Sequence, residues 1–526
     1  MKASQGIRKD DLRAELLANL AKLVACADGE RESIAVYAPF TGAQIGSVPV
    51  CNEAEIAHAV SRARKAQMLW VKRPVTERKA IFLHFHNLLF KHQEEILDLI
   101  QIETGKARLN AFEELLDVAN NCRHYSFRVK RYLKPTRRKG AFPLLTLTRE
   151  YHHPVGVVGI ISPWNYPFTL SISDAIPALL AGNSVVLKPD SQTPFSLLFA
   201  VKLLRDAGLP EDVFQIVTGS GRAIGPTLIP AVDFIDFTGS TETGRLIASQ
   251  AGSHLIKCSL ELGGKNPMLV LNDAKLKPAV EGAIRGCFSN SGQLCIHIER
   301  LYVQSAIYEG FVEAFVKRTK DMKLGSGLDL EADMGSLISV DQMEKVEAHV
   351  CDAVEKGAQV LAGGQARPDI GPFFYEPTIL TGITPDMRIA KEETFGPVVS
   401  VYRFGDVEEG VQMANASSYG LNASIWTIKA RYGRKLAERI QSGTVNINEG
   451  YSATYGSVDS PMGGMKESGL SRRHGIEGIL KYTEPQTISD QRLLPMGAPP
   501  IGVNKKVFVR IMALMLRVLR YIPGLR

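Results

Sequence analysis

Paired cysteines are missing from this sequence. Its seven cysteines are odd in number, scattered along the chain, and never spaced as C-x-x-C. That distribution argues against a disulfide framework and against a zinc site, and it favours a reducing compartment. No metal site is expected. The seven are Cys26, Cys51, Cys122, Cys258, Cys287, Cys295 and Cys351.

Long apolar runs and blocks of like charge are missing as well. No uncharged apolar stretch reaches the ~18 residues that a membrane span requires, and residues 1–20 are charged and helix-like, without the apolar centre of a signal peptide. The net charge of +7 is spread over 526 residues with no basic block in the body of the chain, which argues against nucleic-acid binding. With 45% apolar and 22% charged residues the sequence is typical of a soluble globular protein, and we expect it in the cytoplasm.

Helical and strand-like patterns divide the chain. Apolar residues recur at spacings of three and four from about residue 53 to 132, which predicts helices. Short buried strands then alternate with helices over 156–259 and again over 260–455. This order predicts an α/β fold with two Rossmann-like domains, each built on a parallel sheet with crossover helices. Two segments, 145–153 and 482–490, have the pattern of exposed strands, which would be liabilities on a monomer, so we expect a homodimer or homotetramer.

Residues 504–522 have the pattern of a basic amphipathic helix. Asn504 can cap its start, and the longest uncharged run, 511–516, is too short to cross a bilayer. Two alternatives remain open: the helix packs into an apolar groove of the same oligomer, or it lies in a membrane interface. The basic stripe of this helix consists of Lys506, Arg510, Arg517 and Arg520.

Cys295 is the cysteine with candidate chemistry. A cysteine nucleophile needs a route to the thiolate, donors for a developing oxyanion, and a group for proton transfer. Cys295 follows Gly292 and Gln293 in "FSNSGQLCIHIER", where the backbone can closely approach a ligand. Taken alone, a cysteine in such a segment is more often a packed core residue. We assign that structural role to Cys287, in the apolar part of a predicted helix.

Three distant segments supply what Cys295 needs. Asn165 in "ISPWNYPF" follows a buried strand and offers a neutral donor for an oxyanion. Glu261 stands beside two glycines in "LELGGKNP", at the junction of the two domains, and is a candidate general base. In "FTGSTETGRLI", Gly239 and Gly244 surround a strand-to-helix turn whose backbone N–H groups can meet a phosphate. Because the turn is not G-x-G-x-x-G, it is a weak dinucleotide fingerprint by itself.

Together these segments resemble the aldehyde dehydrogenase superfamily over about residues 30–495. Within it, the sequence is most similar to bacterial succinate-semialdehyde dehydrogenases that use NADP. The motifs occur in the family's order: "PWNYP", "AGNSVVLKP", "FTGSTETG", "LELGGKNP", "FSNSGQLCIHIER", "EETFGP" and "GGMKESG".

The resemblance implies a role for each matching residue. It makes Cys295 the nucleophile, Glu261 the general base, and Asn165 with the Cys295 backbone N–H the oxyanion hole. The implied reaction is thiolate attack on an aldehyde, hydride transfer to a nicotinamide, and hydrolysis of the resulting thioester by water that Glu261 activates. The implied cofactor contacts are Ser162, Pro163, Trp164, Asn165, Lys188, Ser191, Gly239, Ser240, Gly244, Leu262, Glu393 and Phe395.

The resemblance also implies a division of the chain. We expect an N-terminal helical part of the cofactor-binding domain (1–144), an oligomerisation strand (145–155), a dinucleotide-binding Rossmann-like part (156–259), a catalytic domain with the nucleophilic cysteine (260–455), a return segment with a second oligomerisation strand (456–495), and the basic C-terminal helix (496–526).

Ser191 bears on the choice of cofactor. NAD-preferring relatives carry a glutamate there, which grips the ribose hydroxyls. A carboxylate would repel a 2′-phosphate, whereas a hydroxyl beside Lys188 can donate to it. NADP is therefore favoured, with NAD as the alternative because Asp190 is adjacent.

Three positions depart from the family's pattern. Succinate-semialdehyde dehydrogenases hold the distal carboxylate with two arginines, but this chain has Ser173 and Ser289 at the matching positions. A succinic semialdehyde carboxylate would then need another donor, such as His297. Alternatively, the pocket suits an apolar or aromatic aldehyde, with the C-terminal helix visiting membranes. Arg473 replaces a glutamate thought to relay protons, so deacylation would depend on Glu261 or on bulk water.

Two smaller expectations concern residues near Cys295. His297 is expected to be structural or pocket-lining, and Glu299 with Arg300 to form the exposed end of a strand. A third class of function, a catalytically silent protein that inherited the fold, is disfavoured because the key residues are intact.

Overall fold

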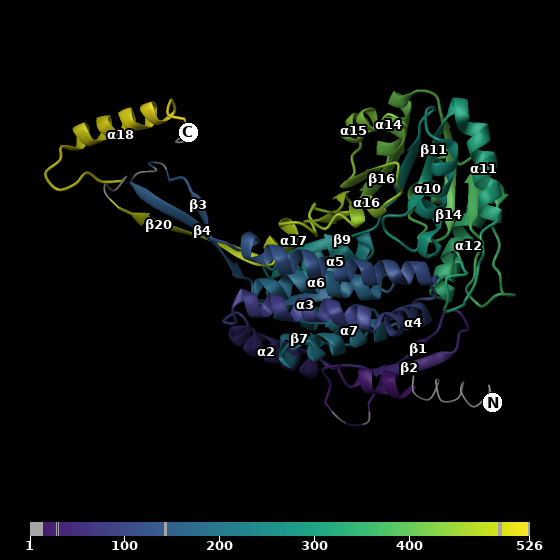
Figure 1. The fold of residues 1–526 in the computed structure, drawn as a ribbon, viewed down its shortest axis with the longest axis horizontal. Helices are drawn as coiled ribbons and strands as arrows, with labels where there is room; N and C mark the ends of the chain where they lie inside the picture. Colours follow the sequence, from purple (N-terminus) through teal and green to yellow (C-terminus); the bar gives the residue numbers. More distant parts are fainter. Residues whose placement is uncertain are drawn as a thin grey trace.

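The computed structural model describes residues 14–27, 29, 31–140, 142, 145–492 and 497–523 (Figure 1). Residues 1–13, part of the helix-like start predicted for 1–20, lie outside this range. Residues 14–21 are helical, as expected.

Helices occupy the region for which the 3.6-residue pattern predicted them. The first begins with a capping box, in which the Asn52 side chain accepts from Glu55 N–H and the Glu55 carboxylate accepts from Asn52 N–H. Its buried face carries Ile56, Ala59 and Val60 at helical spacing. The four helices are α2 (Glu53–Trp70), α3 (Val75–Lys91), α4 (Gln93–Thr104) and α5 (Arg108–Tyr132).

A six-stranded sheet forms the core of the lower lobe, with strand order β19-β9-β8-β5-β6-β7. All of its pairs are parallel except β19 with β9. The strands β5 to β8 are buried, as their continuous apolar runs predicted. The strands are β5 (Val157–Ile161), β6 (Ser184–Lys188), β7 (Phe214–Ile216), β8 (Phe234–Thr238), β9 (Lys257–Glu261) and β19 (Gly469–Leu470). The helices between them are α6 (Pro167–Ala181), α7 (Phe195–Asp206), α8 (Gly221–Leu228) and α9 (Thr241–Ser253).

A seven-stranded sheet forms the core of the second lobe, with strand order β12-β13-β14-β11-β10-β16-β17. Only the β12–β13 pair is antiparallel. Its strands are β10 (Asn266–Val270), β11 (Ile298–Gln304), β12 (Gln359–Ala362), β13 (Thr378–Thr381), β14 (Val398–Phe404), β16 (Asn422–Trp426) and β17 (Thr444–Ile447). Its helices are α10 (Leu276–Phe288), α11 (Tyr308–Lys320), α12 (Val340–Glu355), α14 (Val407–Asn415) and α15 (Ala430–Ala437).

Short elements complete the two lobes. Two of them form a hairpin at the lower edge in Figure 1, β1 (Ser33–Tyr37) and β2 (Gln44–Pro49). The others are β15 (Tyr419–Gly420), β18 (Met465–Lys466), α13 (Arg388–Lys391), α16 (Ser452–Tyr455), α17 (Glu477–Leu480) and the 3-10 turns η1 (Glu211–Val213), η2 (Ile229–Ala231), η3 (Ser289–Gly292) and η4 (Ser305–Ile307).

An arm extends away from both lobes (Figure 1). The two segments predicted as exposed strands pair with each other, antiparallel over nine residues, and a short third strand joins them. Because β20 lies at the edge of this sheet, its outer side is unpaired within the described chain. The arm consists of β3 (Thr136–Arg138), β4 (Thr146–Pro154) and β20 (Thr483–Gln491), with α18 (Lys505–Leu519) at its end.

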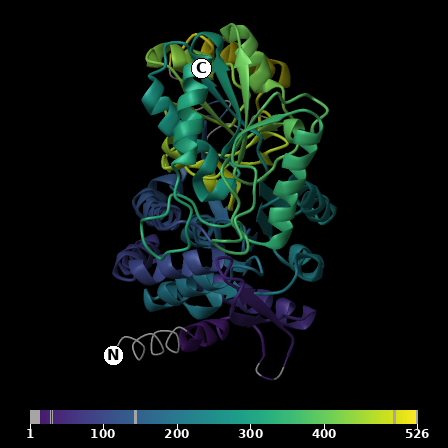
Figure 2. The ribbon, with the colours of Figure 1, turned by 90° about the vertical axis from the view of Figure 1, so that its right-hand side faces the viewer.

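The two sheets meet at the point where the chain passes from one to the other. β9 crosses the boundary expected at 259/260 and ends at Glu261, and β10 begins the second sheet five residues later, at Asn266. Viewed from the side, the two lobes stack one above the other (Figure 2). Side chains at the end of β9 therefore face the junction of the lobes. Among the described residues, no helix is long and apolar enough to cross a membrane.

Candidate active site

The backbone before Cys295 turns sharply. Asn290, Ser291 and Gly292 all have positive φ values, of 51°, 55° and 69°. Positive φ is uncommon for residues other than glycine and persists only where surrounding contacts hold it. The Ser291 hydroxyl donates to the Gly335 carbonyl, and Asn290 Nδ2 donates to the Asn165 carbonyl at 3.2 Å. The cysteine loop is thus fixed from both lobes.

A hydrogen bond to its backbone carbonyl holds Cys295 in place. Asn266 Nδ2 donates to the carbonyls of Cys295 and His297, both at 2.7 Å. A Cβ on Gly264 would lie 2.5 Å from the Cys295 oxygen, so the approach requires glycine. The thiol is half-buried. Burial, with the carboxylates of Glu393 and Glu261, raises the pKa of Cys295 to about 12.

Asn165 lies beside this loop. Its side chain is buried, and Nδ2 donates to the Gln293 carbonyl at 3.0 Å, which leaves the second Nδ2 hydrogen for a ligand. The backbone carbonyl of Asn165 accepts a hydrogen bond from Lys106 Nζ at 2.8 Å, and Lys106 forms an ion pair with Glu114. This buried ion pair fixes the orientation of Asn165, and the sequence patterns did not reveal it.

Glu261 is the last residue of β9. Its side chain is buried, and Oε1 has no hydrogen-bond partner among the described residues. Burial raises the pKa of Glu261 to about 8, while the positive charges of Arg473 and Lys481 oppose the shift. A carboxylate with a pKa near neutrality and a free oxygen has the properties of a general base.

One cavity of about 200 Å³ brings these groups together. It unites the three predicted catalytic residues with most of the predicted cofactor residues. Thr238 and Gly263, which lie within the quoted motifs but had no assigned role, also line it. So do Gln342 and Lys345, which no quoted motif contains; Gln342 donates to the Phe395 carbonyl at 2.8 Å. The predicted residues in the lining are Pro163, Trp164, Asn165, Gly239, Ser240, Glu261, Leu262, Cys295, Glu393 and Phe395.

One wall of this cavity carries Glu393 and Phe395. Glu393 Oε1 accepts from Gly264 N–H at 2.8 Å, and burial raises its pKa to about 7. Phe395 has a φ of 56°, and its ring meets Trp164 edge-on, with centroids 5.5 Å apart. The Glu299 carboxylate accepts from Phe395 N–H at 3.0 Å and so holds this loop in place.

The prediction that Glu299 and Arg300 are exposed is wrong. Their side chains are 1% and 3% exposed, because Lys265 pairs with Glu299 and Arg300 donates to the carbonyls of 265, 413 and 414. Lys265 and hydrogen bonding hold the pKa of Glu299 well below its usual range, despite burial. The strand alternation could not show that distant chain segments cover both side chains.

The remaining predicted cofactor residues lie outside this cavity. Lys188 ends β6; its side chain is 6% exposed, and its ammonium has no hydrogen-bond or ion-pair partner in the described chain. Ser191 Oγ donates to the Gly219 carbonyl at 3.3 Å, and Asp190 accepts from Gln192 N–H. Ser162 Oγ accepts from Ser171 Oγ and is occupied there.

Ser240 and Gly244 open α9 as a close-packed turn. Ser240 is the N-cap, and its Oγ accepts from Thr243 N–H at 3.2 Å. A Cβ on Gly244 would lie 2.5 Å from Leu262 Cδ2, so a larger residue here would require the Leu262 side chain to shift.

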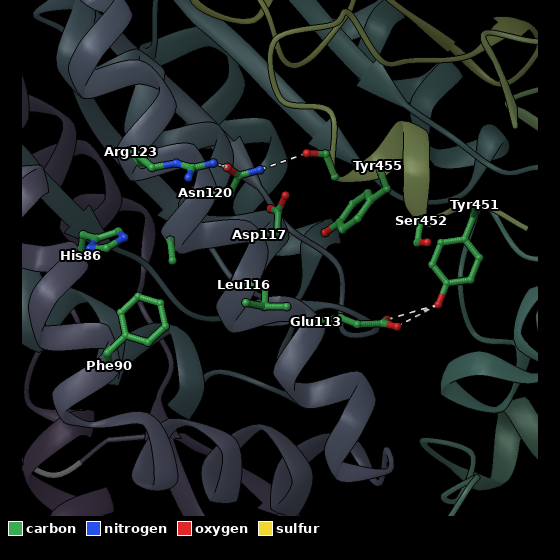
Figure 3. A pocket seen from close by; sticks show the side chains of 12 residues that line it. His86, Phe90, Glu113, Leu116, Asp117, Asn120, Arg123, Tyr451, Ser452 and Tyr455 are labelled. Atoms are coloured by element: carbon green, nitrogen blue, oxygen red, sulfur yellow. Dashed lines mark hydrogen bonds between the residues drawn. The ribbon is translucent and has the colours of Figure 1, made fainter. Parts of the chain in front are cut away.

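A second cavity, of about 450 Å³, is shown in Figure 3. Residues of α3, α5 and the α16 region line it, and it carries both aromatic rings and carboxylates. Tyr451 and Tyr455 line this cavity and also belong to the apolar cluster that packs on Cys295. Figure 3 shows Arg123 on the side opposite Tyr451.

Ser173 and Ser289 stand where the resemblance led us to expect arginines, and both side chains interact with neighbouring groups. Ser173 Oγ donates to Asp117 Oδ2 at 2.6 Å. Burial raises the pKa of Tyr451, and the neighbouring Ser289 side chain opposes this shift. His297 is fully buried, with Nδ1 bonded to the Leu294 carbonyl and Nε2 3.2 Å from Glu299. It is therefore structural and is not available to a substrate carboxylate.

Arg473 lies in a buried charged cluster behind Glu261. Its Nη2 is 3.2 Å from Asp174 Oδ2, and its backbone pairs with Met462. Lys481 joins the cluster through Asp236, 2.8 Å away. The sequence marked Arg473 as a departure from the family's pattern but could not show that Asp174 neutralises it.

Comparison with known proteins agrees with this geometry. The family model described as "Aldehyde dehydrogenase family" matches residues 26–488. A Mycolicibacterium smegmatis protein named "Putative succinate-semialdehyde dehydrogenase, NADP(+)" is 50% identical over 508 residues, covering 96% of this chain and 98% of its own.

Solved structures extend the likeness. An NADP-dependent enzyme of E. coli is 36% identical, with a TM-score of 0.85 and coverage of 90% of this chain and 99% of its own. A Bacillus cereus aldehyde dehydrogenase in complex with NAD+ is 36% identical, with a TM-score of 0.83 and coverage of 88% and 93%. The family model and these relatives, each matching most of the chain, show that the chain belongs to the aldehyde dehydrogenase family.

Proposed function

We propose that this enzyme oxidises an aldehyde to a carboxylic acid at Cys295, with NADP as the preferred cofactor. The observation that carries the proposal is the convergence of Cys295, Asn165 and Glu261 on one cavity. Bound NADP supplies the acceptor for the hydride that the aldehyde carbon loses.

Each of the three residues has a separate task. The Cys295 thiol passes its proton to solvent, and its sulfur attacks the carbonyl carbon while Asn165 Nδ2 and the Cys295 backbone N–H donate to the oxygen as it gains charge. The acyl group then remains on Cys295 as a thioester. The unpartnered Glu261 Oε1 accepts a proton from the water that attacks this thioester and releases the acid.

The cofactor preference rests on the residues beyond the cavity. The Lys188 side chain is largely buried, and its ammonium has no hydrogen-bond or ion-pair partner among the described residues, which suits an anionic ligand. The direction of the Asp190 side chain could not be predicted from the sequence. Its carboxylate accepts a hydrogen bond from Gln192 N–H and so has a partner within its own loop. Both observations support a ribose 2′-phosphate, while NAD stays the alternative. Glu393 and Phe395 would hold the nicotinamide end.

The relatives' names support succinic semialdehyde as the first candidate substrate. The pocket supports a second, an aldehyde without a carboxylate. Ser173 and Ser289 are bound to other groups, and Glu113 and Asp117 place carboxyl groups in the larger cavity (Figure 3). Arg123 is the one guanidinium among the residues that line it.

A comparison of succinic semialdehyde with pentanal separates the two candidates. If a buried charged hydrogen bond recognises the carboxylate, kcat/KM for succinic semialdehyde should exceed that for pentanal by about 10- to 100-fold. NADP and NAD reduction are followed at 340 nm, with benzaldehyde as an aromatic control. A ratio near one, or a preference for pentanal, would replace the first candidate by the second.

We also propose a homodimer or homotetramer, in the cytoplasm. Support for the oligomer comes from the arm, since β20 is an edge strand whose side chains are exposed from Glu484 to Gln491. An exposed edge of this length normally has a partner.

The C-terminal helix supports a second kind of partner, an anionic membrane surface. Phe508 and Met512 pack α18 against Phe142 and Leu145. The rest of its apolar side is open: Val507, Ile511, Leu514 and Val518 are 48–62% exposed. The helix and its C-cap contain five basic residues and no acidic one. This combination is typical of a helix in a membrane interface.

Vesicle binding tests the membrane surface. We expect the full chain to float with vesicles of phosphatidylcholine and phosphatidylglycerol, but not with phosphatidylcholine alone, and to dissociate at high salt. Leu514→Asp with Val518→Asp should abolish flotation, whereas Leu255→Asp, at a 94% exposed site on another helix end, should not. If the double variant instead changes the oligomeric state, α18 packs against another subunit.

A further inference from the structure

Cys26 and Cys51 lie together, although their spacing along the chain did not predict a pair. Their Sγ atoms are 2.9 Å apart, too far for a covalent bond and closer than two unbonded sulfurs normally approach. Cys26 is half-buried and Cys51 is buried, so solvent reaches the pair from the Cys26 side. Both cysteines are distant from the catalytic cavity and have no part in the reaction proposed above.

Both cysteines lie on segments fixed against the edge of the six-stranded sheet. Val24 forms a parallel bridge with Ile216, the end of β7, and Ala25 N–H donates to the Ile216 carbonyl at 2.8 Å. Cys51 N–H donates to the Thr218 carbonyl at 2.9 Å, and Thr218 N–H approaches Cys51 Sγ at 3.5 Å. The same short stretch of chain thus positions both sulfurs.

Glu55, in the first turn of α2, makes a third set of contacts next to the two cysteines. The Glu55 carboxylate accepts from Ala27 N–H at 2.8 Å and Asn52 N–H at 3.0 Å, and pairs with Arg31 at 2.9 Å. These bonds hold Ala27 and Arg31 against the start of α2. A metal ion would have to displace Arg31 from Glu55, the third donor within reach of the sulfurs, so the pair is better suited to oxidation than to ligation.

We propose that Cys26 and Cys51 are a reversible thiol–disulfide pair that hydrogen peroxide oxidises. The Cys26 sulfur attacks the peroxide, forming an S–O bond as the O–O bond breaks, and the leaving oxygen takes the thiol proton to become water. The Cys51 sulfur then attacks Cys26, an S–S bond forms, and the S–O bond breaks. The hydroxyl leaves as a second water with the Cys51 proton. Two thiols lose two electrons, and the peroxide gains them.

The disulfide would fasten the N-terminal segment to the cofactor-binding part of the chain. Thr218 is followed by Gly219, whose carbonyl accepts from Ser191, one of the predicted cofactor residues. Oxidation therefore links the N-terminal segment covalently to the sheet edge beside the proposed site of the ribose phosphate. Cys295 takes no part in this oxidation. The expected effect is a more heat-stable enzyme under oxidising conditions.

Peptide mapping under non-reducing conditions tests the pair. The reduced full chain is treated with hydrogen peroxide in a Cys295→Ala background, alkylated and digested with trypsin. We expect a cross-link between peptides 23–31 and 32–62, the loss of two alkylatable thiols, and reversal by dithiothreitol. The midpoint of thermal unfolding should rise by about 3 °C on oxidation.

Matched variants make the result decisive. Cys26→Ser and Cys51→Ser should each abolish the cross-link and the rise in midpoint, whereas Cys258→Ser, at another half-buried cysteine, should keep both. The thermal midpoint of each reduced variant checks that it folds. Oxidation of Cys26 to the sulfinic acid with Cys51 still alkylatable, or a cross-link between two chains, would overturn the proposal.

Discussion

Replacement of Cys295 by alanine is expected to abolish aldehyde-dependent reduction of NADP. Among the described residues that line the cavity with Asn165 and Glu261, Cys295 carries the only thiol, and no thioester can form without it. We expect kcat to fall by at least ~10⁴-fold, because removal of a covalent nucleophile leaves only binding and oxyanion stabilisation. The measurement is NADPH formation at saturating aldehyde.

The control for this loss is Cys351→Ala. Cys351 is exposed and is not among the lining residues, so its variant should retain full activity. The thermal midpoint of Cys295→Ala should match the wild type, since the thiol makes no hydrogen bond that fixes the loop. Equal activity in wild type and Cys295→Ala would rule out the thioester route. Inactivity of the wild type with every aldehyde tested would favour a catalytically silent protein.

Much of this site could be predicted from short motifs because its backbone geometry demands particular residues. Gly264 must be glycine where it meets the Cys295 carbonyl, and a small residue is favoured at Gly244, where α9 packs on Leu262. Such constraints keep the local sequence fixed around Cys295 and Glu261. The two parallel sheets were likewise predictable, since strands buried on both faces are continuously apolar.

The partners of buried polar groups could not be predicted in the same way. Glu299 was expected at the surface, but Lys265 and the loop of Phe395 cover it. Nor could the sequence show that Asp117 binds Ser173, or that Cys26 lies against Cys51, because these contacts join segments far apart in the chain. Periodicity reports which face is buried, and gives no information on what lies against it.

Replacement of Glu261 by glutamine should separate the two halves of the reaction. Glutamine keeps the shape but cannot accept a proton, so hydrolysis of the thioester should slow by about 10²- to 10⁴-fold. Acylation needs only Cys295 and Asn165, so a first burst of about one NADPH per active site should survive. Stopped-flow absorbance measures the burst and the steady rate together. Equal slowing of both would contradict a role confined to deacylation and would make Glu261 the base for Cys295 as well.

The pH dependence tests the same carboxylate. Burial raises the pKa of Glu261 to about 8, and only the ionised form accepts a proton. Below that pH the group is protonated, so the steady rate should rise with pH through about 8 in the wild type. In Glu261→Gln this rise should disappear from the deacylation-limited rate. A wild-type rise centred near 4.5, the ordinary value for glutamate, would show that burial does not set this pKa.

Arg473 provides the final control, because its charge acts on Glu261 from behind. The guanidinium lowers the pKa of Glu261 against the effect of burial. Arg473→Met should therefore move the rise in rate to higher pH, whereas Arg473→Lys, which keeps the charge beside Asp174, should leave it near the wild-type position. Removing one partner of a buried pair also destabilises the fold, by about 3–5 kcal/mol. The position of the pH profile, which does not depend on the amount of folded enzyme, distinguishes electrostatic control of Glu261 from loss of structure.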